Sequence, residues 1–166
     1  MSDPSPPSVS LFVTCLADLI RPSVAFASIR LLEQAGCIVD VPVQQTCCGQ
    51  PGYNSGDYES TVPIAKKTIA LFEHAQFVVA PSGSCAGMLT EHYPKLLEGE
   101  WQERAIALAE KTYELTSFLA DVVKLDKAPA ILTQMPTVTY HDSCAGLCEL
   151  GIKEQPRKLL RELCEV

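Results

Sequence analysis

Two adjacent cysteines followed by a glycine constrain this chain more than any other feature. Cys47 and Cys48 precede Gly49 within residues 46–52, a polar segment that proline and further glycine interrupt. Buried structural cysteines usually occur singly on the apolar face of a helix or strand. Glycine, in turn, lets the main chain approach another group closely. This pattern indicates a loop that holds a metal centre through its thiols.

Length and composition limit the classes of protein that the chain can represent. It has 166 residues, 47% of them hydrophobic, and a formal net charge of −7. That length suits one well-buried domain but not two complete ones. The negative charge argues against nucleic acid or an anionic membrane surface as the main partner.

Neither a membrane span nor a secretory signal is predicted. No apolar run approaches the roughly 18 residues that a spanning helix needs, and residues 1–7 lack a basic stretch leading into an apolar one. We therefore expect a cytoplasmic protein. In that reducing compartment, the eight cysteines are expected to be ligands or free thiols rather than a disulfide framework.

Strand-like and helix-like segments alternate along the chain. Four buried strands are predicted, at residues 9–14, 38–41, 77–80 and 137–141. Helices are predicted at about 22–35, 58–75, 86–97, 101–123 and 155–166. The expected fold class is α/β, with a parallel sheet and helices on both faces in a Rossmann-like three-layer arrangement.

Most cysteines fall where such a sheet places its ligands. Open parallel sheets bind ligands at the carboxyl ends of their strands. Five cysteines follow a predicted strand: Cys15, Cys47, Cys48, Cys85 and Cys144. We interpret the other three as structural: Cys37, Cys148 and Cys164. The sequence therefore predicts one cysteine-rich edge of the sheet.

The chain also contains the beginning of an internal repeat. Cys15 and Cys144 each end a predicted strand, and each is followed by a proline and then a helix with two adjacent leucines. Cys15 and Cys47 lie 32 positions apart, and the same step from Cys144 reaches position 176, beyond the last residue. We expect a flexible tail at 1–8, a first unit at 9–136 and the start of a second, incomplete unit at 137–166.

These motifs resemble the CCG cysteine-rich domain family. Its pattern is a cysteine, a long gap, Cys-Cys-Gly, a second long gap and Cys-x-x-Cys. Residues 12–16, 45–51, 53–57 and 80–88 carry the likeness, and residues 140–144 resemble the opening of a second such unit. Within the family, the chain is similar to the iron–sulfur subunits of lactate utilisation and glycolate oxidation, which are related to the CCG-containing component of heterodisulfide reductase.

One departure from the family pattern concerns the last cysteine of Cys-x-x-Cys. Met88 occupies that position, so the first unit offers four thiols rather than five. A thioether is a poor substitute for a thiolate at iron, and we expect Met88 to pack in the core.

The resemblance implies a cofactor, a role and partners. It implies an iron–sulfur cluster of the [4Fe-4S] type, including a non-cubane arrangement. The implied cluster ligands are Cys15, Cys47, Cys48 and Cys85, joined by Cys144. The chain would then be a non-catalytic electron-transfer subunit of a complex that oxidises L-lactate or a related 2-hydroxy acid. Its partners would be the other subunits of that complex, a ferredoxin-like iron–sulfur or flavin subunit.

The chemistry of the residues leaves alternatives open. Four thiolates suit an iron–sulfur cluster but also tetrahedral zinc in a non-redox or scaffold subunit. A third alternative is heterodisulfide-type reduction, in which the cluster itself is the catalyst. A thiol–disulfide enzyme is disfavoured because the chain has no Cys-x-x-Cys motif. A disulfide between Cys47 and Cys48 would strain the peptide that joins them.

Other polar residues give weaker signals. His141 and Asp142 end the fourth predicted strand, where they could tune a cluster or make structural hydrogen bonds. His74 and His92 are expected at the surface. Residues 82–84 resemble an anion-cradling turn, yet the chain has no Walker lysine and no G-x-G-x-x-G, which disfavours nucleotide binding.

Overall fold

A four-stranded parallel sheet forms the centre of the molecule. The computed structural model of the protein describes residues 5–126 and 137–161. In this part of the chain, the strands are β1 (Ser8–Leu11), β2 (Ile38–Asp40), β3 (Phe77–Ala80) and β4 (Thr112–Glu114), in the order β2-β1-β3-β4. Val9 of β1 pairs with Val39 on one side and Phe77 on the other, which fixes the register.

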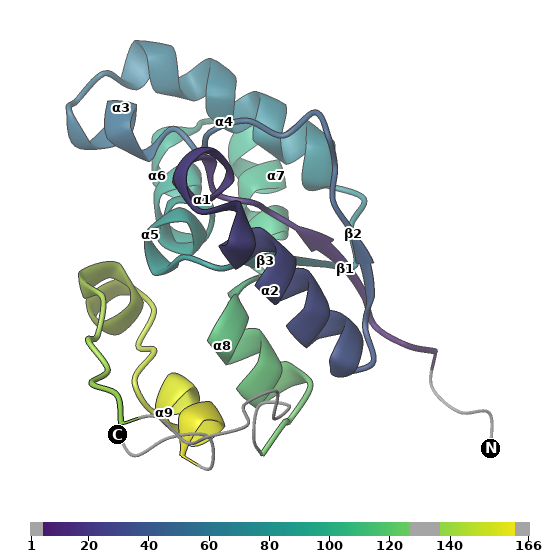
Figure 1. Ribbon diagram of the computed structural model, residues 1–166. Helices are drawn as coiled ribbons and strands as arrows, with labels where there is room; N and C mark the ends of the chain where they lie inside the picture. Colours follow the sequence, from purple (N-terminus) through teal and green to yellow (C-terminus); the bar gives the residue numbers. More distant parts are fainter. Residues whose placement is uncertain (1–4, 127–136, 162–166) are drawn as a thin grey trace.

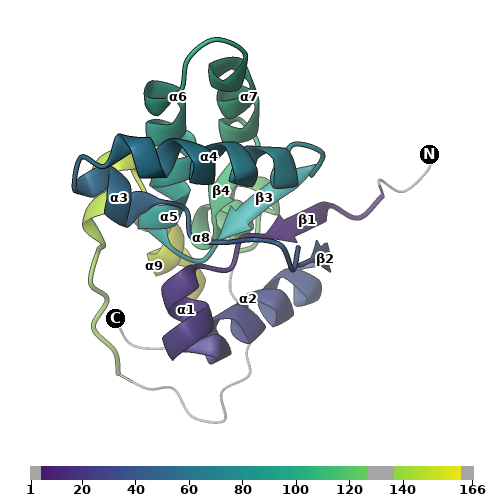
Figure 2. The same ribbon diagram turned by 90° about the horizontal axis from the view of Figure 1, so that it is seen from above.

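Helices cover both faces of this sheet, as the two views show (Figures 1 and 2). Helices α3 (Gln50–Asn54), α4 (Tyr58–Phe72), α6 (Tyr93–Leu96) and α7 (Glu100–Ala109) lie on one side. Helices α1 (Cys15–Ile20), α2 (Pro22–Gln34), α8 (Leu115–Ser117) and α9 (Glu154–Leu160) lie on the other. The predicted α/β class with helices on both faces is confirmed.

The remaining helical segments lie beside the carboxyl end of β3 or extend these helices. They are α5 (Gly83–Gly87) and the π-helical turns η1 (Met88–His92), η2 (Phe118–Val122) and η3 (Ala145–Glu149). None of the helices in residues 5–126 and 137–161 is long and apolar enough to cross a membrane.

Each face of the sheet has its own hydrophobic core. One core packs Phe12, Ile69, Phe72, Met88 and Leu108 between the sheet and the helices around α4 and α7. Met88 is fully buried there, which confirms its predicted place in the core. The second core packs the opposite face of the sheet against α2, η2 and α9 through Leu32, Phe118 and Leu159.

Local sequence signals account for the helix boundaries. Pro22 stands at the first position of α2, where its missing N–H costs nothing. That helix ends before Gly36, whose φ of 84° suits the left-handed conformation of a C-terminal cap. Asp57 caps α4 by accepting a hydrogen bond from the Ser60 N–H at 3.1 Å.

The fourth strand differs from the prediction. It is Thr112–Glu114, inside the segment 101–123 that we predicted as one helix. Residues 137–141 have only an isolated bridge at Thr137 and form no strand. A three-residue strand is too short to interrupt the helical spacing of apolar residues around it, so the periodicity concealed it.

The other boundaries agree with the prediction to within a few residues, except that α9, predicted to reach residue 166, ends at Leu160, and residues 162–166 lie outside the described residues. Two helices are additional. Helix α1 precedes the predicted helix α2, and α3 forms inside the segment predicted as a loop. The predicted division between two units, between residues 136 and 137, borders residues 127–136, which lie outside the described residues, as does Cys164.

Candidate metal centre

Four cysteines meet at the carboxyl edge of the sheet as two thiol pairs. Cys15 is the first residue of α1 after β1, Cys47 and Cys48 follow β2, and Cys85 lies in α5 after β3. The Sγ atoms of Cys15 and Cys47, the outer pair, are 3.5 Å apart. Those of Cys48 and Cys85, the inner pair, are 3.4 Å apart. Parallel strands therefore bring together thiols that are 32 and 37 residues apart in sequence.

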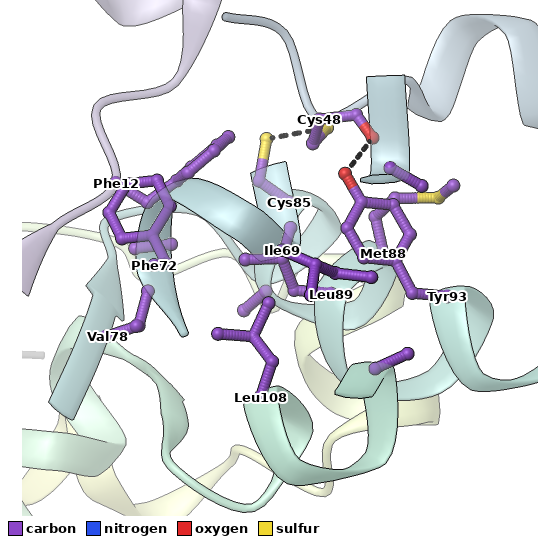
Figure 3. Close-up of a cluster of buried hydrophobic side chains, with 14 of the residues drawn as sticks. Phe12, Cys48, Ile69, Phe72, Val78, Cys85, Met88, Leu89, Tyr93 and Leu108 are labelled. Atoms are coloured by element: carbon purple, nitrogen blue, oxygen red, sulfur yellow. Dashed lines mark hydrogen bonds between the residues drawn. The ribbon is translucent and has the colours of Figure 1, made fainter. Parts of the chain in front are cut away.

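The two pairs differ in their exposure to solvent. Cys48 and Cys85 are 2% and 7% exposed, and Figure 3 shows their thiols facing one another above the core around Ile69. Cys15 is exposed and Cys47 is half-buried. The outer pair borders a hollow of about 340 Å³, which is lined by Val13, Cys15, Asp18, Val41, Pro42, Val43, Gln45, Thr46 and Cys47. One side of the site is therefore closed and the other is open.

The hydrogen bond between the two inner thiols shifts their pKa values in opposite directions. The hydrogen bond to Cys85, and then burial, raise the pKa of the Cys48 thiol. The pKa of Cys85 is lowered because the Cys48 thiol donates to its sulfur, and the Ser82 side chain adds a further hydrogen bond. In the outer pair, burial and then the hydrogen bond to Cys47 raise the pKa of Cys15. Cys85 is thus the member of the inner pair that favours the thiolate form.

Tyr93 and Gly49 position the cysteine loop. The buried Tyr93 hydroxyl donates a hydrogen bond to the main-chain oxygen of Cys48 at 2.7 Å, as Figure 3 also shows. Gly49 has a φ of 83°, and its N–H points to the Cys47 Sγ at 3.4 Å. A Cβ atom at Gly49 would lie 3.1 Å from the Cγ2 of Thr61. Both the backbone conformation and the available space therefore favour glycine after the cysteine pair.

Gln45 ties the same loop to the strand that leads to Cys15. Its side-chain Oε1 accepts a hydrogen bond from the Val13 N–H at 2.7 Å. Its Nε2 donates to the Leu11 carbonyl at 3.4 Å. One amide side chain thus fixes the distance between the two segments that carry the outer pair.

Cys144 reaches this region by a different route from the one predicted. No strand precedes it within residues 137–143, and it is exposed at the start of η3. Turn η3 packs against α5, and the two lie side by side in Figure 1. A Cβ atom on Gly83 would lie 2.8 Å from the Gly146 nitrogen. Glycine at position 83 therefore permits this contact, which brings the segment with Cys144 beside the helix of Cys85.

Among the other predicted structural cysteines, Cys37 is 6% exposed in the second core, and burial raises the pKa of its thiol. Cys148 is exposed on η3 and belongs to neither core. Its predicted structural role stays a prediction.

The histidines and Asp142 have structural contacts. His74 is 92% exposed, as predicted. His92 is only partly exposed: its side chain is 21% exposed, its Nε2 lies 3.2 Å from Glu149, and its Nδ1 is buried without a partner within the described residues. Asp142 accepts two hydrogen bonds from Arg157, at 2.8 and 2.6 Å.

The donors fit an iron–sulfur centre in their chemistry. Thiolates are the ligands that iron–sulfur clusters prefer, and four can complete the coordination of a common cluster. In residues 5–126 and 137–161, however, no three or more His, Cys, Asp or Glu side chains are grouped to hold a single ion. The thiols form two pairs rather than one closed tetrahedron.

Comparison with known proteins agrees with the motifs. Residues 9–90 match the family model described as CCG, cysteine-rich domain. The chain is 50% identical over 157 residues to lactate utilization protein A of Geobacillus sp. (strain WCH70). It is 46% identical over 158 residues to the protein of that name from Anoxybacillus flavithermus and 47% identical over 157 residues to that from Bacillus licheniformis.

These matches cover 93–94% of this chain, which spans 65% of the length of each relative. No solved structure matches it. The resemblance to the CCG cysteine-rich domain and to the lactate-utilisation proteins is confirmed.

Proposed function

We propose that the two thiol pairs bind an iron–sulfur cluster. We further propose that the protein, whose residues 9–90 match the CCG cysteine-rich domain, is an electron-transfer subunit of a complex that oxidises L-lactate or a related 2-hydroxy acid. The proposed ligands are Cys15, Cys47, Cys48 and Cys85, with Cys144 as a further ligand from the segment that opens a second unit. When bound, such a cluster supplies one-electron transfer.

The arrangement of the four sulfur atoms is the observation that carries this proposal. Two thiolates on one tetrahedral metal at about 2.3 Å lie roughly 3.8 Å apart. The distances within the outer and inner pairs, 3.5 and 3.4 Å, are close to that spacing. Two separate pairs are suited to a centre with more than one metal atom. A single structural zinc ion would instead need all four sulfur atoms around one point.

The surroundings of the pairs suit electron transfer between proteins. The buried inner pair lies over an apolar core that excludes water. The local dielectric and the number of hydrogen bonds to sulfur both affect the reduction potential of such a centre. The outer pair, at the open side, would be the part of the site nearest a redox partner. We propose that this partner is a ferredoxin-like iron–sulfur or flavin subunit and that the carbon chemistry takes place in the partner subunits rather than in this one.

The substrate class and the compartment are proposals that rest on other evidence. Relatives named lactate utilization protein A support lactate as the substrate of the whole system. The cytoplasm is the proposed compartment because free thiols persist in reducing surroundings. Residues 9–136 are proposed to form the first CCG unit and residues 137–166 to begin the second.

Anaerobic reconstitution with ferrous iron and sulfide tests the cluster. We expect a brown chain with visible absorption and an EPR signal on reduction or oxidation. Cys48→Ser and Cys85→Ser should lose most of that signal, whereas Cys37→Ser, which alters a buried thiol away from the site, should keep it. A colourless chain that binds one zinc ion and takes up no sulfide would contradict the redox role.

Growth of a deletion strain tests the substrate. Without the gene, growth on lactate should fail while growth on glucose is unaffected. The wild-type gene should restore growth on lactate, and the gene with Cys48→Ser should not. Unimpaired growth of the deletion strain on lactate would exclude lactate as the substrate that requires this protein.

A further inference from the structure

The sulfur atoms of each pair are close enough to form a disulfide after a small movement. A disulfide bond is about 2.05 Å long, so the outer pair at 3.5 Å must close by roughly 1.5 Å. Cys47 lies on irregular backbone, and Cys15 begins a short helix with no buried residue, so their side chains can turn toward each other while Gln45 holds the two segments together. The inner pair, at 3.4 Å, has a similar gap to close.

Other pairings are less favourable. Cys47 and Cys48 are neighbours in sequence, and a disulfide between neighbours strains the peptide bond that joins them. Cys37 is buried in the core on the opposite face of the sheet. Within residues 5–126 and 137–161, the thiols of Cys37, Cys144 and Cys148 make no sulfur–sulfur contact.

We propose that the metal-free protein is a redox-sensitive double dithiol, that is, two thiol pairs that each oxidise to a disulfide. A small-molecule disulfide such as oxidised glutathione would oxidise them to the specific bonds Cys15–Cys47 and Cys48–Cys85. The assignment of these pairs comes from the sulfur positions and does not depend on the proposed function.

Each bond forms by two thiol–disulfide exchanges. A thiolate of a pair attacks one sulfur of oxidised glutathione and displaces glutathione as its thiolate. The second thiol of the pair, as its thiolate, then attacks the mixed disulfide and displaces the other glutathione sulfur from the protein. The pair loses two electrons and two protons, and oxidised glutathione becomes two molecules of glutathione.

Exposure sets the order of the two reactions. Cys15 is exposed and Cys47 is half-buried, so glutathione can reach the outer pair directly. Cys48 and Cys85 are 2% and 7% exposed and require local opening of the loop. The outer disulfide should therefore form at least tenfold faster than the inner one.

The disulfides have a consequence that rests on the proposed function. Each bond removes two of the four proposed cluster ligands, so oxidation of either pair should prevent cluster loading until a reductant reverses it. A disulfide also protects the thiols from irreversible oxidation to sulfinic acid. The same residues would thus act as a reversible gate on assembly of the metal centre.

Disulfide mapping on the metal-free, full-length chain tests the pairing. The chain is reduced, treated with chelator, exposed to oxidised glutathione, alkylated at intervals and analysed by peptide mass spectrometry with fragmentation that separates residue 47 from residue 48. We expect the Cys15–Cys47 bond first and the Cys48–Cys85 bond later, with Cys37 and Cys144 alkylated throughout. A Cys15–Cys85 or Cys47–Cys48 bond, or no bond within the four, would overturn the proposal.

Two matched variants give an independent check. Cys47→Ser should leave Cys15 alkylated and the inner bond intact, whereas Cys48→Ser should leave Cys85 alkylated and the outer bond intact. Transfer of the bond to the remaining neighbour in either variant would show that the pairs are not specific and would overturn the assignment. The wild-type map decides the question if either variant fails to fold.

Iron uptake separates this proposal from the proposed function. The oxidised chain should take up at least tenfold less iron and sulfide than the reduced chain, and dithiothreitol should restore uptake. If the two bonds form but the reduced chain takes up no iron, the pairing stands and the cluster role fails. If the reduced chain loads a cluster but the bonds do not form, the cluster role stands and the double dithiol fails.

Discussion

The hydroxyl of Tyr93 donates a hydrogen bond to the main-chain oxygen of Cys48 at 2.7 Å, from a side chain that is fully buried. Tyr93 begins α6, and the Thr68 side chain of α4 also hydrogen-bonds its hydroxyl. This one phenol therefore links two helices to the cysteine loop. Its aromatic ring belongs to the core, while its polar end fixes the backbone of the segment that carries Cys47 and Cys48.

Replacing Tyr93 by phenylalanine should destabilise the protein without changing its fold. The ring remains, but a buried carbonyl loses its donor, which typically costs about 1–3 kcal/mol. The free energy of unfolding in urea measures the effect. Tyr58→Phe is the matched control, because that side chain is half exposed, and its cost should stay within about 0.5 kcal/mol. Equal costs for the two variants would show that the hydrogen bond does not contribute.

The contact between α5 and η3 predicts different results for the same substitution at two glycines. Gly83→Ala places a Cβ atom 2.8 Å from the backbone nitrogen of Gly146, and backbone cannot move aside easily. We expect a loss of about 1–3 kcal/mol in the free energy of unfolding. Gly87→Ala meets only the carboxylate of Glu149, with its Oε2 at 2.6 Å, and this group can swing away. It should cost clearly less, and a reversed order would contradict the close packing.

The ion pair between Asp142 and Arg157 predicts a pH dependence of stability. The hydrogen bonds from Arg157 lower the pKa of the Asp142 carboxyl below its ordinary value of 3.8. The contribution of the carboxylate is therefore fully present above pH 3.8 and is lost as the pH falls through the lowered value. Asp142→Asn should flatten this part of the stability profile, measured by thermal unfolding between about pH 2 and 6.

Asp126→Asn is the control for that experiment. Asp126 lies 3.1 Å from Lys158, but its side chain is 94% exposed, so solvent screens the pair. The acid side of its stability profile should match that of the wild type. An unchanged profile for Asp142→Asn would mean that the carboxylate is not held by Arg157 in solution.

The first three strands, and with them four of the five predicted site cysteines, could be predicted from the sequence. Short apolar runs ahead of Cys15, Cys47 and Cys85 indicate parallel strands, and parallel strands end at a common edge. The cysteine spacing alone does not reveal that the thiols divide into pairs. That division depends on side-chain directions in the loop and in α5, which Gln45 and Tyr93 fix through contacts across the fold.

The position of Cys144 could not be predicted because a tertiary contact decides it. Residues 137–141 have the composition of a strand, yet the fourth strand of the sheet is Thr112–Glu114, hidden in a helical pattern. The contact of Gly83 with Gly146 depends on a close approach of two backbones that are far apart in sequence. Local secondary-structure propensity does not predict such a contact. The partial burial of His92 escapes prediction for the same reason, because its partner Glu149 lies 57 residues away.

X-ray absorption at the iron edge of the anaerobically reconstituted protein tests the central claim most directly, because it counts the metal neighbours of each iron. We predict a first shell of sulfur together with a second iron atom at short range, and we predict that Cys85→Ser weakens both while Cys37→Ser changes neither. Sulfur-coordinated iron without a neighbouring iron would contradict the account, since the two thiol pairs would then bind isolated ions rather than a cluster.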